Sequence, residues 1–371
     1  MAATSRTEVY DAVLTTTARH MNGEIRDNIT RSNKVVAWLE GNGRKRMVSG
    51  GERIKVPLMN ELNQGADIFS GYGQLDTTPA DGITSAFFPW SQMAVPITIS
   101  GLEQRQNNGP EQIRDLLQAK MMQSQASAVE LQNNCIVAGK IASGASGSVN
   151  QFVARTGNLD SSANGPLPLA VLIDADDDRS VAVGDINGNS EAWWRNQVKA
   201  SSASTYAGFK TELNNLYNTC RRGAGGAPDL AICDQLVWEL YFQSLQQQER
   251  YFVTNQRTIN ILGGAEEDML KFRNAVLVWD EVVPDVGTTT ANAVDSIGTS
   301  LQSGSHGTLY FLNSESLEYI VHPDADWTQT EFVVPVNQDA RVAHLLWQGQ
   351  WVVNNRRKNG VMYDIDNSIT S

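Results

Sequence analysis

The chain has 371 residues, of which 41% are hydrophobic and 19% are charged, and its 29 Lys and Arg against 41 Asp and Glu give a formal charge of −12. This acidic balance excludes a general nucleic-acid coat, because such a coat needs net positive charge to displace counterions from phosphates. No apolar run approaches the roughly 18 residues of a membrane span, so no membrane partner is expected, and three cysteines do not make a disulfide framework.

Residues 1–100 combine a polar arm with apolar segments that have little core of their own. Residues 52–62 predict an edge strand, because Ile54, Val56 and Leu58 alternate with other positions and Pro57 removes a ladder donor. Residues 94–100 predict another strand. The turn-rich stretch between them usually needs a surface to pack on, since it carries large apolar residues: Ile68, Phe69, Tyr72, Phe87, Phe88 and Trp90.

The strongest helical pattern covers residues 110–138. Pro110 occupies the first helical position, where its missing N–H costs little, and Gly139 ends the pattern. At about 1.5 Å per residue this helix is about 40 Å long, which suits a spine. Its apolar residues recur at three- and four-residue steps: Ile113, Leu116, Leu117, Met121, Ala128, Leu131 and Cys135.

The second half of the chain alternates helices and strands. A helix at 206–222, a buried strand at 230–233 and a helix at 235–245 predict an α/β unit. The stretches 139–192 and 285–307 are predicted to be mainly loops. Further strands are expected at residues 275–279, 308–312, 317–321, 331–336, 343–347 and 350–354.

Local motifs for catalysis and cofactor binding are missing from the sequence. It has no phosphate-binding glycine loop, dinucleotide fingerprint, zinc-protease motif, serine-hydrolase elbow or C-x-x-C pair. The four histidines are scattered, and none lies at metal-ligand spacing from a cysteine or another histidine. We therefore expect a protein that is not an enzyme, with no catalytic residue, no cofactor and no metal site.

One acidic run partly matches the pattern of a calcium-binding loop. Asp174, Asp176 and Asp178 alternate, and Asp185 falls where such a loop has its bidentate acid. However, Arg179 replaces the glycine of the sharp turn. A solvated acidic loop is the favoured interpretation, with a calcium site as the alternative.

Two short basic runs interrupt this acidic chain. Residues 44–46 (Arg-Lys-Arg) lie in a glycine-rich hinge at 41–51, and residues 356–358 (Arg-Arg-Lys) follow the last predicted strand. Either run could be a solvated turn. The alternative for each run is ion pairing with acids of a neighbouring subunit, which suits an acidic chain, and for the second run the resemblance described below favours this alternative.

Several strings occur in an order typical of one family. GYGQLDTTPADGIT followed by WSQMAVPITISGLE resembles an extended loop and its return strand, and PEQIRDLLQAKMMQSQASAVE lies where that family has its spine helix. EAWWRNQ, APDLAICDQLVWELY, LYFLNSESLEYIVHPDADW and QWVVNNRRKNGV resemble successive later segments. Over about residues 48–365 the chain thus resembles the major capsid proteins of tailed bacteriophages, which have the Hong Kong 97-type fold.

The resemblance implies an α+β fold of this type and a non-enzymatic head protein. Pentamers and hexamers would form an icosahedral shell around double-stranded DNA, located in the virion after assembly in the host cytoplasm. The implied parts are an N-terminal arm (1–48), an extended two-stranded loop (49–100), a peripheral domain with the spine helix and connecting loops (101–199), an α/β axial domain (200–320) and a return to the peripheral domain (321–371).

The implied partners are further copies of the chain, a scaffolding protein, a portal and a decoration protein, with packaged DNA in loose, non-specific contact. The scaffolding protein is expected to be separate, because the extended loop starts by residue 52. Cross-linking of Lys55 to Asn354 or Asn355, as in some relatives, is not favoured. The expected assembly contacts are Lys55, Phe69, Tyr72, Asp76, Asp81, Arg356 and Arg357.

Two other interpretations stay open. An encapsulin-type nanocompartment shell protein shares the fold but encloses an enzyme, so the contents of purified shells would distinguish it. A soluble carbohydrate-active enzyme would use carboxylates such as those at 174–185, with tryptophans stacking on sugar. A monomer with hydrolytic activity would support that least favoured alternative.

Overall fold

The computed structural model describes two compact units of the chain. The described residues are 33–63, 65, 68, 70–73, 82–106, 116–137, 166–175, 182–223, 225–246, 270–280, 282–283, 306–366 and 369. Among them, the first unit contains residues within Val95–Ala128 and Thr330–Leu345. The second contains residues within Arg31–Ala94, Val129–Gln329 and Leu346–Ser371.

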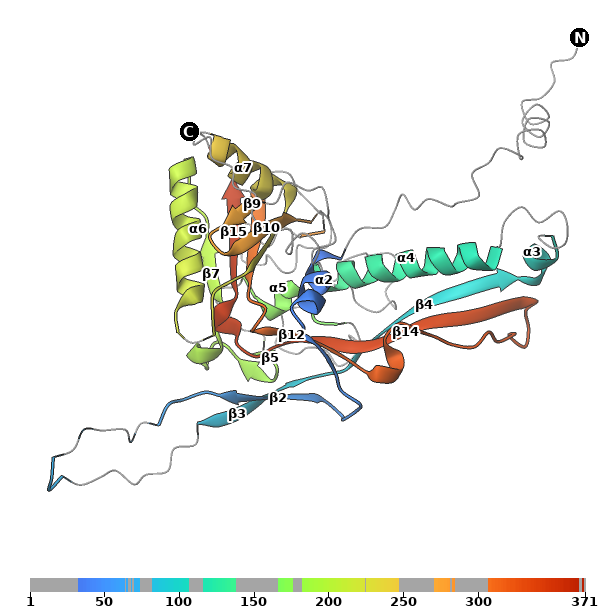
Figure 1. Ribbon diagram of the computed structural model, residues 1–371, viewed down its shortest axis with the longest axis horizontal. Coiled ribbons are helices and arrows are strands. Elements are labelled where there is room, and N and C mark those ends of the chain that lie inside the picture. The colour runs from blue at the N-terminus through green and yellow to red at the C-terminus, as the bar shows by residue number, and fades with distance from the viewer. Residues whose placement is uncertain are drawn as a thin grey trace, which may run out of the picture. The chain divides into compact units, whose positions relative to one another are not determined.

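A six-stranded sheet forms the centre of the second unit (Figure 1). Its order is β7-β15-β11-β8-β10-β9, in which β8 lies parallel to β10 and antiparallel to β11. All residues of β8 are buried, as expected for a strand with packed layers on both faces. The bounds are β7 Gln197–Ala200, β8 Leu230–Cys233, β9 Leu270–Phe272, β10 Ala275–Trp279, β11 His306–Leu312 and β15 Gly360–Asp366.

Two helices, α6 (Tyr206–Arg221) and α7 (Gln235–Gln246), pack on one face of this sheet. Thr205 caps α6 by accepting a hydrogen bond from the Gly208 N–H at 3.2 Å. Because strand side chains alternate between faces, Ala231 and Cys233 join the cluster under these helices, whereas Leu230 and Ile232 join a different core.

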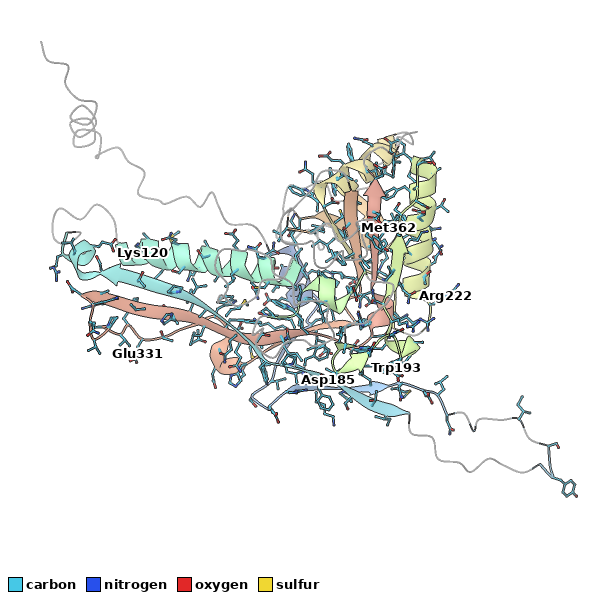
Figure 2. All side chains as sticks on the ribbon, turned by 180° about the vertical axis from the view of Figure 1, so that it is seen from behind. Lys120, Asp185, Trp193, Arg222, Glu331 and Met362 are labelled. Carbon is cyan, nitrogen blue, oxygen red and sulfur yellow. The ribbon has the colours of Figure 1, made fainter. Side chains whose placement is uncertain are left out.

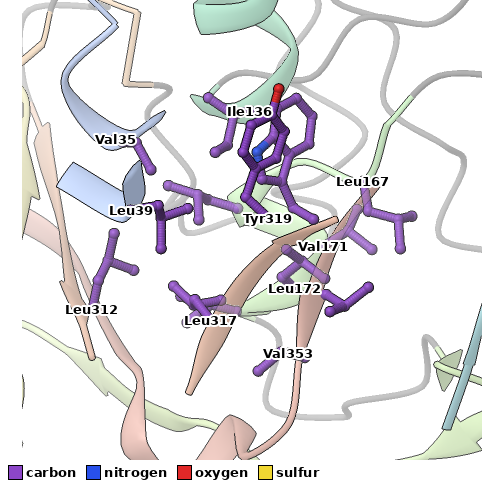
Figure 3. Packing of buried hydrophobic residues seen from close by; sticks show 14 of the residues in the cluster. Val35, Leu39, Ile136, Leu167, Val171, Leu172, Leu312, Leu317, Tyr319 and Val353 are labelled. Atoms are coloured by element: carbon purple, nitrogen blue, oxygen red, sulfur yellow. The ribbon is translucent and has the colours of Figure 1, made fainter. Parts of the chain in front are cut away.

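That second core connects the sheet with α2 (Lys34–Gly41), α5 (Leu169–Leu172) and the end of α4 (Leu116–Val137). Figure 3 shows Leu39 of α2, Ile136 of α4 and Leu172 of α5 among its side chains. Asn33 caps α2 by accepting from the Val36 N–H at 3.0 Å. Because α2 and α5 are too short to be stable alone, burial of their apolar residues holds them in place.

A second sheet contains the longest described strand, β14 (Ala340–Val353). Its order is β1-β12-β14-β13, and β4 also pairs with β14. The Tyr319 ring stacks on Trp347 and Trp351, with ring centroids 6.1 and 5.9 Å apart. The Tyr319 hydroxyl accepts hydrogen bonds from Gln132 Nε2 and Trp347 Nε1, both at 2.8 Å. The other bounds are β1 Lys45–Met47, β4 Ser91–Ser100, β12 Leu317–Val321 and β13 Thr328–Gln329.

In the first unit, α4 runs beside β4 and β14 (Figure 1). Val95, Ile97 and Ile99 of β4 are buried at alternate positions, as the sequence predicts. α3 (Gly101–Gln106) begins with a capping box in which the Ser100 hydroxyl accepts from the Glu103 N–H and the Glu103 carboxylate accepts from the Ser100 N–H, at 3.1 and 3.2 Å.

The remaining elements are short. β2 (Ile54–Met59) and β3 (Ile83–Phe88) form a two-stranded ribbon, and β5 (Ala182–Val183) and β6 (Ile186–Asn187) form a small hairpin. The described residues also include three short 3₁₀ helices: η3 (Ala192–Trp194), η4 (Pro323–Ala325) and η5 (Arg356–Lys358).

Several sequence predictions need correction. The strands predicted at 343–347 and 350–354 are the single strand β14, because Gly349 continues the ladder opposite Val321. The prediction of a strand at residues 331–336 is wrong. The described backbone there makes an isolated bridge between Val333 and Val342, and Pro335 has no N–H to extend it.

Two predicted segments are described only in part. The 110–138 helix is described as α4 over 116–137, and residues 110–115 lie outside the described residues. The stretch 139–192, predicted as loops, contains α5, β5, β6 and η3 in its described part. Pairing and burial against the larger core stabilise these short elements, which have too few residues for a clear periodic signal.

The Tyr319 hydroxyl provides a stability test. Tyr319→Phe should lower the free energy of unfolding by about 1–3 kcal/mol, because two buried donors lose their acceptor. Urea unfolding of the unassembled chain measures this. Tyr206→Phe is the control, since that half-buried hydroxyl bonds to Gln243 near the surface. Equal free energies of unfolding for Tyr319→Phe and Tyr206→Phe would contradict the stabilising role given to the Tyr319 hydroxyl.

Candidate assembly surfaces

The two faces of the β2–β3 ribbon differ in burial. On one face Ile54 lies opposite Phe88 and Val56 lies opposite Ala86, and these side chains are buried. The predicted alternation in β2 is therefore confirmed, and Pro57 lies in a strand that pairs on one side only. The other face carries the cross-strand pairs Lys55–Phe87, Pro57–Ser85 and Met59–Ile83.

This second face, the outer face, is apolar at one end. The Met59 and Ile83 side chains lie opposite each other and are 73% and 74% exposed. At the other end the Lys55 ammonium lies 5.8 Å from the centroid of the Phe87 ring, a cation–π contact. The outer face thus offers apolar surface and one positive charge to a partner.

The base of the ribbon is anchored to the β5–β6 hairpin of the same unit. The Phe87 N–H donates to the Gly184 carbonyl at 3.1 Å, and Arg53 pairs with Asp185 at 2.6 Å. Gly184 and Asp185 form the β5–β6 turn with φ of 66° and 62°, and a Cβ at Gly184 would lie 2.7 Å from the Ala86 methyl. Glycine is therefore required where the hairpin meets the ribbon.

Residues 61–82 connect β2 with β3 and are called the distal segment, and the described ones among them include exposed apolar side chains. Ile68 is 97% exposed and Tyr72 is 106% exposed, so their own chain covers neither. Leu62 is also exposed. Large apolar residues gathered in this way are typical of surfaces that bind another molecule. Phe69, Asp76 and Asp81, which were predicted as assembly contacts, lie outside the described residues.

The basic run 356–358 does not form the predicted exposed cluster. The Arg356 side chain is 1% exposed. Its guanidinium donates to the carbonyls of Leu172 and Trp194 and to Asn196 Oδ1, at 2.9, 3.5 and 3.1 Å. Arg356 therefore joins α5, η3 and η5 within its own chain, and its prediction as a surface contact is corrected. Arg357 is exposed.

Lys358 is also directed inward. Its ammonium donates to the carbonyls of Arg222 and Gly223, both at 3.0 Å, and lies 3.4 Å from those of Arg221 and Gly226. These carbonyls end α6 and form the turn after it, where the helix dipole favours a cation. Burial lowers the pKa of Lys358, and the Arg357 charge lowers it further. We regard the ammonium as charged because several carbonyl dipoles point at it.

Two members of the first basic run, Lys45 and Arg46, are paired with acids of their own chain. Lys45 and Arg46 lie in β1, which pairs parallel to β12, so this part of the predicted hinge is a strand. Lys45 contacts Glu40 at 3.1 Å and Asp326 at 2.7 Å. Burial lowers the pKa of Lys45, but the hydrogen bonds and charges of these two acids raise it above its usual value overall. Arg46 lies 3.6 Å from Glu318.

The described residues of the acidic run 174–185 do not form a metal site. Asp174 is buried rather than solvated, and its carbonyl accepts a hydrogen bond from Asn196 Nδ2 at 2.6 Å. Asp185 pairs with Arg53, whereas Asp176 and Asp178 lie outside the described residues. Among the residues that the structure describes, no three His, Cys, Asp or Glu side chains are placed to hold a metal ion.

The three cysteines are free and buried. Burial raises the pKa of the Cys220 thiol to about 12 and raises that of Cys233 as well. Neither sulfur is therefore a ready nucleophile. In the described part of the chain, no helix is long and apolar enough to cross a membrane.

Solved structures match the chain over nearly its full length, although no family model and no curated protein matches it. The cyanophage A-1(L) capsid is 11% identical with a TM-score of 0.63, covering 93% of this chain and 96% of that chain. The encapsulin complex of Synechococcus elongatus PCC 7942 is 9% identical with a TM-score of 0.54, covering 100% and 99%. A structure from Gordonia phage Cozz is 14% identical with a TM-score of 0.53, covering 98% and 96%.

These likenesses define the class of the fold, which is that of proteins forming phage capsids and encapsulin shells. The chain has the Hong Kong 97-type capsid fold, and the predicted α+β class is confirmed. The resemblance to tailed-bacteriophage capsid proteins is confirmed at the level of the fold.

Lys358 and its neighbour Arg357 form a matched pair for mutation. Lys358→Met should lower the free energy of unfolding by about 2–3 kcal/mol, because buried carbonyls lose their donor. Arg357→Met should change it by no more than about 0.5 kcal/mol, because the side chain is exposed. Urea unfolding followed by circular dichroism distinguishes them. Two equally mild effects would show that the Lys358 contacts contribute little.

Proposed function

We propose that the protein is a major capsid protein that self-assembles as pentamers and hexamers into an icosahedral shell around double-stranded DNA. The observation that carries this proposal is the ribbon, whose outer face and distal segment expose Met59, Ile83, Ile68 and Tyr72 to solvent. Apolar surface that its own chain leaves uncovered favours association with another molecule. The capsid fold makes further copies of the same chain the natural partners.

The proposed assembly contacts follow from the same surface. Lys55 on the outer face, Tyr72 on the distal segment and the exposed Arg357 are the described members. Phe69, Asp76 and Asp81 of segment 61–82 complete the set. The division into arm, extended loop, peripheral domain and axial domain is part of the proposal, as are a separate scaffolding protein, a portal and a location in the virion.

Negative-stain electron microscopy of the purified recombinant chain is the first test. Closed shells, sheets, tubes or ring-shaped capsomers would support the proposal. A monomer that stays dispersed with every candidate scaffolding protein, and that hydrolyses a carbohydrate, would replace the proposal with the enzyme alternative.

Deleting residues 62–80 should leave a folded capsomer that cannot close shells, because the distal segment supplies contacts between subunits. Size exclusion and circular dichroism measure the capsomer and its fold, and electron microscopy measures closure. Shells of normal size from the deletion variant would rule out the role given to this segment.

A single substitution tests the outer face. Met59→Asp should reduce shell formation about tenfold or more, since a desolvated charge would replace an apolar contact. The unfolding midpoint of the free chain should stay unchanged, because Met59 is exposed. Met47→Asp is the control, since Met47 is an exposed strand residue outside the ribbon. Equal assembly of both variants would argue against a buried outer face.

An encapsulin-type shell is a second candidate, favoured by the full-length likeness to the Synechococcus elongatus encapsulin. Both candidates predict shells, so their contents distinguish them. Nuclease-protected DNA inside shells purified from the native source supports the capsid, and a co-purifying enzyme supports the nanocompartment.

A further inference from the structure

The sequence contains six Asn–Gly pairs, and an Asn–Gly pair can modify itself by deamidation. In this reaction the amide nitrogen of the glycine attacks the side-chain carbon Cγ of the asparagine. Because the two residues are the same in every pair, differences in reactivity between folded pairs come from their surroundings. The structure describes three of the pairs: Asn42–Gly43, Asn187–Gly188 and Asn359–Gly360.

The Asn187–Gly188 pair lies in the turn between β6 and η3, and its peptide carbonyl is polarised. Figure 2 labels Trp193 of η3, where this turn ends. The Asn187 carbonyl accepts hydrogen bonds from the Glu191 N–H at 3.0 Å and the Ser190 hydroxyl at 3.1 Å. This carbonyl belongs to the same amide as the Gly188 N–H, so the two donors make that N–H easier to deprotonate.

The side chain of Asn187 is polarised as well. Its Oδ1 accepts a hydrogen bond from the Asn189 N–H at 2.8 Å, a donor placed where negative charge develops when Cγ is attacked. The Arg195 guanidinium donates to the Gly188 carbonyl at 2.6 Å, which strengthens the Asn189 N–H of the same amide. Gly188 is buried, but the Asn187 side chain is exposed, so water and the leaving ammonia have access from the side-chain direction.

The Asn42–Gly43 pair is held differently. The Gly43 N–H donates to the Glu40 carbonyl at 2.9 Å, so the attacking nitrogen is itself engaged in a hydrogen bond. The Asn42 Nδ2 donates to the Trp38 carbonyl at 2.9 Å, so the leaving nitrogen is also held by α2. In contrast, the Gly188 N–H has no acceptor among the residues that the structure describes.

The Asn359–Gly360 pair is polarised but buried. The Asn359 Oδ1 accepts hydrogen bonds from the Asn313 N–H and the Ser316 hydroxyl, both at 3.0 Å, and the residue is 0% exposed. Gly360 begins β15, which pairs with β11 on one side and with β7 on the other. A backbone paired on both sides resists the rotation that ring closure needs, and the burial excludes the water that would open the ring.

We propose that Asn187 is a self-modification site, at which the chain converts this asparagine to aspartate or isoaspartate. Hydroxide removes the Gly188 amide proton, the nitrogen attacks Asn187 Cγ, and the Cγ–Nδ2 bond breaks to release ammonia, to which water supplies the proton. Water then opens the cyclic imide, giving aspartate by attack at Cγ and isoaspartate by attack at the main-chain carbonyl. The reaction needs only water and hydroxide, and the inference does not depend on the proposed function.

The modification would change the hairpin that holds the ribbon. Either product adds a negative charge to the turn that Arg195 binds. Isoaspartate also inserts a methylene into the main chain at the end of β6, where Asn187 lies opposite Ala182 of β5. The same hairpin contains Gly184, whose carbonyl accepts the hydrogen bond from the Phe87 N–H at the ribbon base.

Peptide mapping by mass spectrometry tests the site in the full chain. The tryptic peptides 180–195, 35–44 and 359–371 carry Asn187, Asn42 and Asn359 separately. During incubation of the folded chain at mildly alkaline pH, Asn187 should convert about tenfold faster than either of the other two. In guanidinium chloride, which removes the fold, the three rates should agree within about threefold. A folded chain in which Asn187 converts no faster than Asn42 or Asn359 would overturn the inference.

A single substitution tests the hydrogen bonding in the turn. Ser190→Ala should slow conversion of Asn187 about threefold, because the Asn187 carbonyl loses one donor. Ser127→Ala is the matched control, since the Ser127 hydroxyl donates to the Gln123 carbonyl of α4 at 2.9 Å, and the Asn187 rate should stay at the wild-type value. Circular dichroism checks that both variants fold. If Ser190→Ala converts Asn187 as fast as the control or faster, a loose turn rather than hydrogen bonding sets the rate, and the inference is wrong.

Discussion

A two-stranded ribbon has two faces, and its own chain can cover only one of them when no third layer is available. In this protein the covered face packs Ile54, Val56 and Phe88 into the larger core of the second unit, and the base is held by Gly184 and Arg53. The outer face and the distal segment keep Met59, Ile83 and Tyr72 in water. The proposed association of copies would remove this apolar surface from water.

Buried cations connect short elements and turns of the second unit. Arg356 reaches carbonyls of α5 and η3, and Lys358 reaches the turn after α6. A charge in the interior is tolerated only where hydrogen bonds replace its lost hydration. The inward direction of Lys358 fixes the turn that follows α6.

Local periodicity in the sequence predicted the helices and strands that bury one regular face of apolar side chains. The four apolar residues of β8, the spacing of Phe209, Leu213 and Leu216 in α6, and the alternation in β2 and β4 each follow from one face meeting a core. The strand prediction for residues 331–336 failed because Val333 and Val334 have strand propensity, whereas Pro335 lacks the backbone N–H that a strand ladder needs. Of the predicted contacts, Lys55, Tyr72 and Arg357 are exposed, and Arg356 is not.

The amino-acid sequence alone indicates the acidic balance, the helix and strand periods and the presence of an apolar ribbon with little core. These are properties of composition and of residues within a few positions of one another. Which of Arg356, Arg357 and Lys358 face inward depends on the folded chain. The acceptors of the Lys358 ammonium lie 132 to 137 residues earlier in the chain, and the side chain turns toward them because a buried ammonium needs several carbonyls that only the folded α6 turn brings together.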